Sequence, residues 1–157
     1  MTRERKTHVI TFAVLAAALA VAVAEKAPWK QATREPAGPQ DAIYGMLDAA
    51  RNGSVPAYLA SYAGEMQASL QQSVRESGES AFAQYLRQSN AALKGVALSD
   101  PQLVNDSEAT VRVEYVYQER NEAQTMHLGK VNGTWKITRV DGVERVKTLV
   151  PYGTPVR

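Results

Sequence analysis

The stretch MHLGKVNGTWKITRV, Met126 to Val140, decides the fold. It holds two runs of alternating apolar and polar residues on either side of Asn132-Gly133. Asn-Gly between such runs is the strongest short signal for a β-hairpin, because both turn residues adopt positive φ. The pattern therefore predicts two antiparallel strands, over residues 125–131 and 134–140, with a register set by the two-residue turn.

The predicted register assigns each side chain of the hairpin to one face of the sheet. Leu128 lies opposite Ile137, and His127 lies opposite Thr138. The core face then carries Met126, Leu128, Trp135 and Ile137. The outer face carries His127, Val131, Thr138 and Val140. This parity favours a half-exposed sheet residue at His127 over a catalytic histidine.

Two further strands are predicted before the hairpin. Residues from Ala109 to Glu119 alternate cleanly, which indicates a half-buried antiparallel strand with Tyr115 and Tyr117 on its core face. Residues 96–104 are predicted to form the first strand, which Asp100-Pro101 interrupts.

A second turn pair, Asp141-Gly142, leaves two alternatives for the end of the chain. The chain can fold back against the preceding strand, with Arg139 opposite Glu144. The same pairing would place Lys136 opposite Lys147, and like charges directly opposite are unfavourable. An extra strand and an extended arm are both kept as expectations.

The earlier part of the chain has the period of a helix instead. Apolar residues recur at helical spacing at Ile43, Met46, Leu47 and Ala50. Helices are predicted from Pro39 to Asn52, from Ser54 to Tyr62, from Met66 to Gly78 and from Glu79 to Lys94. In the last helix, Phe82, Tyr85 and Leu86 are predicted to share the packed side. Helices followed by an antiparallel sheet define an α+β fold, with the helices on the concave face of a curved sheet.

Three segments carry a resemblance to a known superfamily: AARNGSVPAYLASY (49–62), ATVRVEYVY (109–117) and GKVNGTWKI (129–137). Together they resemble the nuclear transport factor 2-like (cystatin-like cone) superfamily, and in particular small exported bacterial domains of unknown function. The resemblance covers about residues 40–140. It implies a cone with an apolar pocket between sheet and helices, and often a homodimer formed through the sheet.

Six aromatic residues are candidates for the lining of that pocket. They are Tyr58, Tyr62, Phe82, Tyr115, Tyr117 and Trp135. Lining a pocket would suit a carrier of a small apolar ligand. The competing interpretation is an ordinary core, because aromatic residues at these spacings are normal packing.

Enzymes of this superfamily, such as ketosteroid isomerases, scytalone dehydratases and polyketide cyclases, use an Asp inside the cone, often with a Tyr or His. Asp41, Tyr44 and Asp48 offer these residue types at helical spacing. At about 100° per residue, both Asp side chains lie on the side away from the apolar stripe. A general base must face its substrate, so no catalytic residue is assigned and an enzyme is not expected.

Metal chemistry is not expected either. The chain has no Cys and two His, which excludes thiolate sites and disfavours a His-rich centre. No cofactor-binding motif is present in the sequence, so no cofactor is assigned.

The first 24 residues are predicted to be a targeting segment. Arg3, Arg5 and Lys6 precede 16 uncharged residues, Val9 to Ala24, which as a helix would span about 24 Å. That is short for a bilayer core of about 30 Å, and the run ends in small residues of the kind a signal peptidase recognises. A cleaved signal peptide is favoured over an uncleaved membrane anchor. Both would export the rest of the chain. After cleavage it would lie in the periplasm or be secreted, and with an uncleaved anchor it would stay attached to the inner membrane, outside the cytoplasm.

The charge balance changes when the targeting segment is set aside. The whole chain carries 18 basic and 16 acidic residues. Without Arg3, Arg5, Lys6 and Glu4, the exported part carries 15 of each. A net charge near zero provides no electrostatic basis for binding nucleic acid.

The sequence thus predicts four parts: a signal peptide or anchor (1–24), a linker with three Pro (25–40), the α+β domain (41–140), and an extra strand or arm (141–157). The expected function is non-catalytic, through contacts with an envelope protein or with a second copy. The alternatives are a carrier of a small apolar ligand and an isomerase or dehydratase. Contact with the membrane is expected only through residues 9–24, if they are not cleaved.

Overall fold

The computed structural model describes residues 37–147. In this part of the chain, four helices pack against one face of a six-stranded antiparallel sheet, which confirms the predicted α+β class. The helices are α2 (Pro39–Asn52), α3 (Val55–Ala60), α4 (Gly64–Ser77) and α5 (Glu79–Ala91). The strands are β1 (Gly95–Leu98), β2 (Gln102–Asn105), β3 (Glu108–Val116), β4 (Asn121–Val131), β5 (Thr134–Val140) and β6 (Glu144–Val146).

The predicted targeting segment and the last ten residues lie outside the described part. No helix within residues 37–147 is long and apolar enough to cross a membrane. The first described helix begins at Pro39, two residues before the predicted start of the domain.

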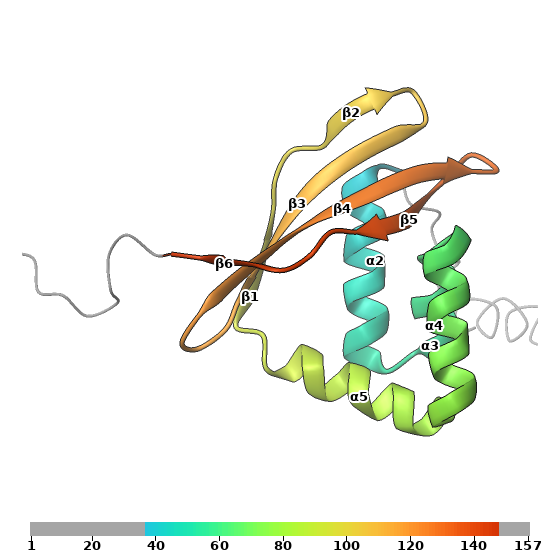
Figure 1. The fold of residues 1–157 in the computed structure, drawn as a ribbon, viewed down its shortest axis with the longest axis vertical. Helices are drawn as coiled ribbons and strands as arrows, with labels where there is room; N and C mark the ends of the chain where they lie inside the picture. Colours follow the sequence, from blue (N-terminus) through green and yellow to red (C-terminus); the bar gives the residue numbers. More distant parts are fainter. Residues whose placement is uncertain (1–36, 148–157) are drawn as a thin grey trace, which may run out of the picture. The chain divides into compact units, whose positions relative to one another are not determined.

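A long central hairpin organises the sheet. β3 pairs along its whole length with residues 121–129 of β4, and the two strands bend over the helices (Figure 1). Each is flanked by an edge strand in two parts: β1 and β2 both pair with β3, and β5 and β6 both pair with β4. Every strand thus pairs with a strand near it in sequence, and the interruption predicted at Asp100-Pro101 separates β1 from β2.

The hairpin register is confirmed from the turn to the fourth pair. Asn132 and Gly133 have φ of 52° and 81°, and the pairs run from Val131 with Thr134 to Leu128 with Ile137. The next predicted pair is wrong, because a β-bulge inserts there and His127 lies opposite Arg139.

The bulge also corrects the predicted face of Val140. Thr138 is the extra residue, and its Oγ1 donates to the His127 carbonyl oxygen at 3.2 Å. One inserted residue reverses the side-chain alternation beyond it. Val140 therefore lies opposite the buried Met126 and packs against the core instead of facing outward.

An extra strand does follow β5, but its partner differs from the predicted one. β6 pairs with the first part of β4, with Ala123 opposite Glu144 and Asn121 opposite Val146. The chain does not fold back at Asp141-Gly142, because the Asp141 N–H continues the ladder by donating to the Thr125 carbonyl oxygen at 2.9 Å. The predicted pairing of Arg139 with Glu144 is therefore wrong.

The helix α2 provides the main contact between the helical layer and the sheet. Its predicted apolar stripe is buried, with Ile43 fully inaccessible to solvent. Gly53 ends the helix in the left-handed conformation, at φ 66°, as expected for a residue after the last turn. Ser54 is the N-cap residue of α3, and its side chain makes no capping hydrogen bond there.

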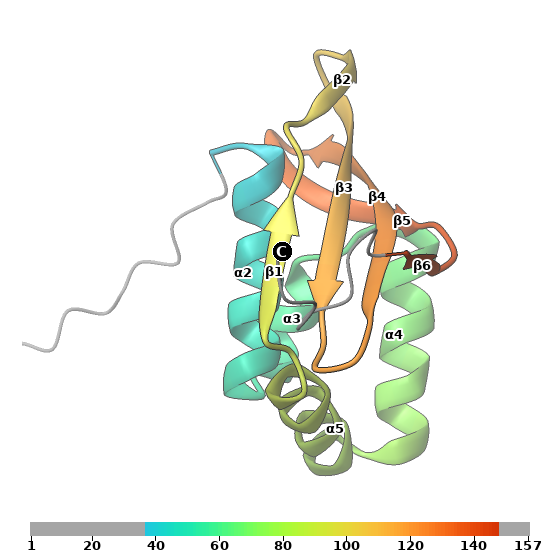
Figure 2. The same ribbon diagram turned by 90° about the vertical axis from the view of Figure 1, so that its left-hand side faces the viewer.

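The last helix, α5, crosses below the other three (Figures 1 and 2). It ends at Ala91, three residues earlier than predicted. Phe82 and Leu86 are buried as predicted, whereas Tyr85 is 62% exposed. Only one narrow stripe of α5 therefore meets the remaining helices.

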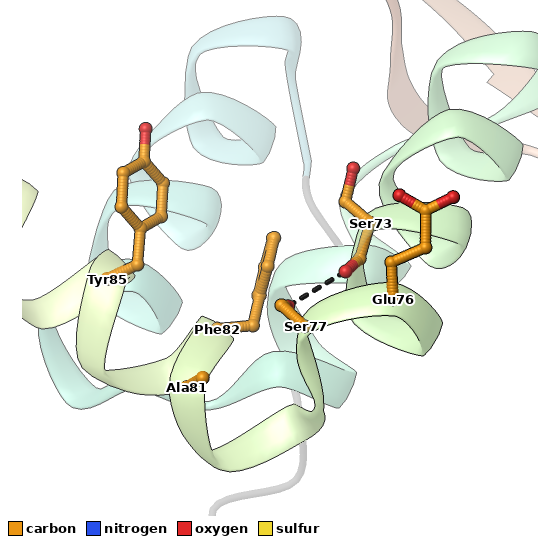
Figure 3. A pocket seen from close by; sticks show the side chains of 6 residues that line it. All are labelled: Ser73, Glu76, Ser77, Ala81, Phe82 and Tyr85. Atoms are coloured by element: carbon orange, nitrogen blue, oxygen red, sulfur yellow. Dashed lines mark hydrogen bonds between the residues drawn. The ribbon is translucent and has the colours of Figure 1, made fainter.

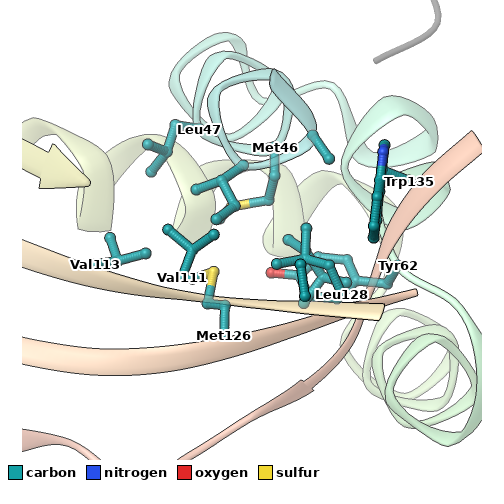
Figure 4. Packing of buried hydrophobic residues seen from close by; sticks show 12 residues of the cluster. Met46, Leu47, Tyr62, Val111, Val113, Met126, Leu128 and Trp135 are labelled. Atoms are coloured by element: carbon teal, nitrogen blue, oxygen red, sulfur yellow. The ribbon is translucent and has the colours of Figure 1, made fainter. Parts of the chain in front are cut away.

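The core fills the space between α2 and the sheet (Figure 4). Trp135 is buried there with Tyr62, Ile137 and apolar residues of α2, β3 and β4. The segment after α3 closes the outer edge of β5: the Ile137 N–H donates to the Ser61 carbonyl oxygen at 2.9 Å, and the Ala63 N–H donates to the Ile137 carbonyl oxygen at 3.0 Å. This pairing covers an edge that would otherwise expose unpaired backbone groups.

Candidate functional site

A row of four aromatic rings leads from the surface into the core. The ring centroids of Tyr85 and Phe82 are 6.2 Å apart, those of Phe82 and Tyr58 are 6.1 Å apart, and those of Tyr58 and Tyr62 are 5.2 Å apart. The planes are tilted by 48° to 59°, within the range that aromatic pairs favour. The row connects the exposed side of α5 with the buried Tyr62, which follows α3.

The two inner tyrosines share a hydrogen bond. The Tyr62 hydroxyl donates to the Tyr58 hydroxyl oxygen at 3.0 Å. Burial raises the pKa of both phenols, and the neighbouring Tyr58 raises the pKa of Tyr62 further. Both side chains are therefore neutral hydrogen-bonding groups at physiological pH.

Tyr115 of β3, and Tyr117 just after that strand, approach the same row. Burial is the main cause that raises the pKa of Tyr115, and Tyr58 contributes to it. Tyr117 lies at the end of the strand, where the Arg120 guanidinium carbon is 4.5 Å from its ring centroid. Arg120 also pairs with Glu122 at 2.6 Å. Its charge is thus already matched by a carboxylate.

The row opens into a hollow of about 500 Å³ between α4 and α5. Its lining consists of Ser73, Glu76, Ser77, Ala81, Phe82 and Tyr85. Figure 3 shows the rings of Phe82 and Tyr85 rising side by side from α5, with the polar residues of α4 opposite them. The hollow is open to solvent, and it joins an aromatic wall to a polar wall.

The six aromatic residues predicted to line a pocket occupy three environments. Phe82 lines the hollow and packs against Tyr58 behind it. Tyr62 and Trp135 belong to the buried core. Tyr115 packs against that core, and Tyr117 is half-buried at the end of β3.

Sequence reasoning missed the polar half of the hollow. Ser73, Glu76 and Ser77 lie on α4, which has no fully buried residue. Their spacing of three and four residues puts them on one helix face. Nothing in the sequence distinguishes that face from an ordinary solvated one, because the surface opposite it is provided by α5 only in the folded chain.

A second hollow, of about 300 Å³, lies on the other side of α5. It is lined by Tyr44, Leu47, Asp48, Arg51, Asn90, Leu93, Lys94, Gly95 and Val96. Asp48 and Arg51 in its wall pair with each other at 3.4 Å, and both are largely exposed.

The acidic residues weighed for catalysis are at the surface. Asp41 is exposed and accepts a hydrogen bond from the Gly38 N–H at 3.1 Å, so it caps α2. Asp48 is exposed too. Both face away from the core, as the helix angles predict. Among residues 37–147, no three His, Cys, Asp or Glu side chains come together in a way that could hold a metal ion.

The outer face of the sheet carries a charged cluster around His127. His127 Nε2 lies 2.9 Å from an Asp141 carboxylate oxygen, and Arg139 Nε lies 3.2 Å from the other. Arg139 also lies 2.7 Å from His127 Nε2. That nitrogen cannot donate to Asp141 and accept from Arg139 at once, and the charge-assisted bond to the carboxylate is the stronger one.

The Asp141 interactions predict a pH dependence of stability. The hydrogen bond from His127 is the main cause that lowers the pKa of this carboxyl below 3.8. The stabilisation is present above the ordinary pKa and is lost as pH falls through the lowered one. Asp141→Asn should therefore lower the free energy of unfolding at about pH 7. At about pH 2.5 the difference between the variant and the wild type should be smaller. Urea denaturation at the two pH values measures this, with the exposed turn variant Asp106→Asn as control. An equal difference at both pH values would contradict it.

Comparisons with known proteins add little to this geometry. No protein-family model matches the sequence, and no curated protein matches it. Among solved structures, a DUF4783 family protein from Bacteroides ovatus is similar, with a TM-score of 0.41 and 12% identity over 66% of this chain and 94% of that chain.

Proposed function

We propose that the protein is a non-catalytic domain of the nuclear transport factor 2-like kind that binds a small, largely apolar ligand between α4 and α5. The single observation that carries the proposal is the aromatic row ending in the 500 Å³ hollow. A hollow of this size accommodates a drug-sized molecule. Exposed aromatic surface, as at Tyr85, is a common feature of such sites.

The hollow supports binding better than catalysis. Glu76 is the one carboxylate in its lining, and no histidine lines it. General acid–base chemistry needs groups positioned around a reacting atom, and a single carboxylate at the rim does not provide them. Mass spectrometry should return a ligand unchanged after prolonged incubation with the protein, and a converted product would contradict this.

Blocking the hollow should abolish binding. The uncharged probe 2-naphthylmethanol should bind with a dissociation constant of roughly 0.1–1 mM, which suits a ligand of its size. Ala81→Trp should remove this binding by filling the hollow, because Ala81 lines it and is exposed. Titration followed by two-dimensional NMR measures the affinity and shows which amides shift.

A matched variant separates blocking from an unspecific effect of tryptophan. Ala68 is exposed on α4 and does not line the hollow, so Ala68→Trp should bind the probe like the wild type. Equal binding by both variants, or probe-induced shifts confined to another surface, would contradict the proposed site.

We propose protein contact as the second function, on the strength of strand β2. Leu103 and Val104 are 67% and 66% exposed on this short edge strand, and exposed edges favour pairing with another chain. The outer face, with its ion pairs, is a poorer surface for a homodimer. Sedimentation velocity should detect a dimer at about 100 µM that Leu103→Lys converts to monomer; a monomer at every concentration speaks against self-association.

Export is proposed on the sequence of the first 24 residues. A purified chain that begins at Glu25 would establish cleavage of a signal peptide, and one that keeps residues 1–24 in the membrane fraction would establish an anchor. Mass spectrometry of the N-terminus distinguishes these. An uncleaved chain in the cytosolic fraction would contradict export.

A further inference from the structure

The polar wall of the hollow, formed by Ser73, Glu76 and Ser77, offers side-chain acceptors and no free side-chain donor. The Ser77 hydroxyl donates to the Ser73 carbonyl oxygen at 2.8 Å (Figure 3), and the Ser73 hydroxyl donates to the Ser69 carbonyl oxygen at 3.2 Å. Both hydroxyl hydrogens are therefore used within α4. Their oxygens keep lone pairs that can accept a hydrogen bond from a ligand.

Glu76 adds a negative charge without a cationic partner. Its carboxylate accepts a hydrogen bond from the neutral Gln72 amide at 2.6 Å. Arg75 is next in sequence, but its guanidinium donates to the Gln72 side-chain oxygen, at 2.8 and 3.2 Å. Within the described part of the chain, no Lys, Arg or His pairs with Glu76. The charge is left to attract a ligand.

The aromatic wall favours the same sign of charge. Phe82 and Tyr85 lie 6.2 Å apart and both line the hollow. The faces of aromatic rings are electronegative and attract cations. No basic side chain contributes to the lining, so nothing in the hollow opposes a positive ligand or favours a carboxylate.

From these groups we infer that the ligand is an organic cation: a protonated amine on an apolar body that carries a ring. The ammonium would donate hydrogen bonds to Glu76 and to the serine oxygens, and the body would lie on Phe82 and Tyr85. This inference rests on the proposed function, because it specifies the ligand of the same hollow. An uncharged ligand would use only the aromatic wall.

Two probes with the same body separate the charge from the apolar contact. At pH 7 and low salt, 2-naphthylmethylamine is a cation and 2-naphthylmethanol is neutral. The amine should bind about fivefold more tightly, which matches an exposed ion pair together with a weak cation–π contact. Added salt should reduce this preference and leave the binding of the alcohol unchanged.

Isosteric variants assign the preference to one carboxylate. Glu76→Gln should remove most of the preference for the amine, with little effect on the alcohol. Glu65→Gln is the control, because Glu65 is exposed on the same helix and does not line the hollow. NMR titration of the purified protein gives all affinities and confirms that the variants are folded.

The outcomes distinguish this inference from the proposed function. Equal binding of the two probes, or a preference that survives in Glu76→Gln, overturns the cationic ligand and leaves the hollow as an apolar site. Binding of neither probe at α4 and α5 overturns the proposed function itself.

Discussion

Trp135→Ala is expected to lower the free energy of unfolding by about 3–5 kcal/mol, the usual cost of removing a large buried aromatic side chain. Trp135 is 6% exposed and belongs to the core that joins α2 to the sheet. Domains of this size are stable by about 5–15 kcal/mol in total. The variant should therefore be close to unfolding at 37 °C. Urea denaturation followed by far-ultraviolet circular dichroism measures the change without relying on tryptophan fluorescence.

Two further variants make the Trp135 result interpretable. Val143→Ala removes a side chain that is exposed between β5 and β6 and should change stability by less than about 0.5 kcal/mol. Trp135→Phe keeps an aromatic ring and should fold even if the alanine variant does not. A loss below about 1 kcal/mol in Trp135→Ala would show that this side chain does not support the core.

Gly53→Ala should destabilise the domain by about 2–3 kcal/mol, for two separate reasons. Gly53 ends α2 at φ 66°, and a left-handed conformation costs a non-glycine residue about 1–2 kcal/mol. A Cβ atom there would also overlap the Arg87 guanidinium and lie 3.2 Å from the Ala83 carbonyl oxygen. Arg87 can swing away, but the Ala83 backbone in α5 must shift.

Gly45 provides the matched control for this substitution. It is exposed within α2, and nothing lies within 4 Å of an added Cβ atom. Gly45→Ala should stabilise the helix by about 0.5–1 kcal/mol. Chemical denaturation of both variants measures the contrast, and changes of the same sign would contradict the role assigned to Gly53.

The hairpin shows how far local sequence reaches. The Asn132-Gly133 turn predicts the pairs up to Leu128 with Ile137, because a two-residue turn leaves one register. It does not predict the bulge at Thr138. Beyond that residue, the side chains of β5 lie on the faces opposite to those that simple alternation assigns. Val140 was therefore predicted on the wrong face.

The ends of the chain segments show a second limit. Asp141-Gly142 has the composition of a turn, yet Asp141 interacts with His127, fourteen residues earlier. Such a contact is set by the folded sheet and leaves no local signal. In the same way, the helical period identified a packed side of α5 but not how much of that side the other helices cover. Tyr85 was therefore assigned to the interior, although it is exposed.

The candidate site was the least predictable part of the molecule. Its aromatic residues were visible in the sequence, but they were assigned to a pocket between the sheet and the helices, whereas the hollow that Phe82 lines lies between α4 and α5. The carboxylate of Glu76 was not predicted to be part of a site. Its face of α4 gains a facing surface only because α5 packs across the end of the bundle.

The pairing of each strand with one near it in sequence has a consequence for the order of folding. The β3–β4 hairpin closes across a short loop, so little chain entropy is lost before its first contacts form. The long β3–β4 hairpin can therefore gather its edge strands early, and the contact between Ser61–Ala63 and Ile137 must wait for the helices. Amide hydrogens of the central hairpin should accordingly exchange most slowly with solvent, and those of α4 should exchange far sooner.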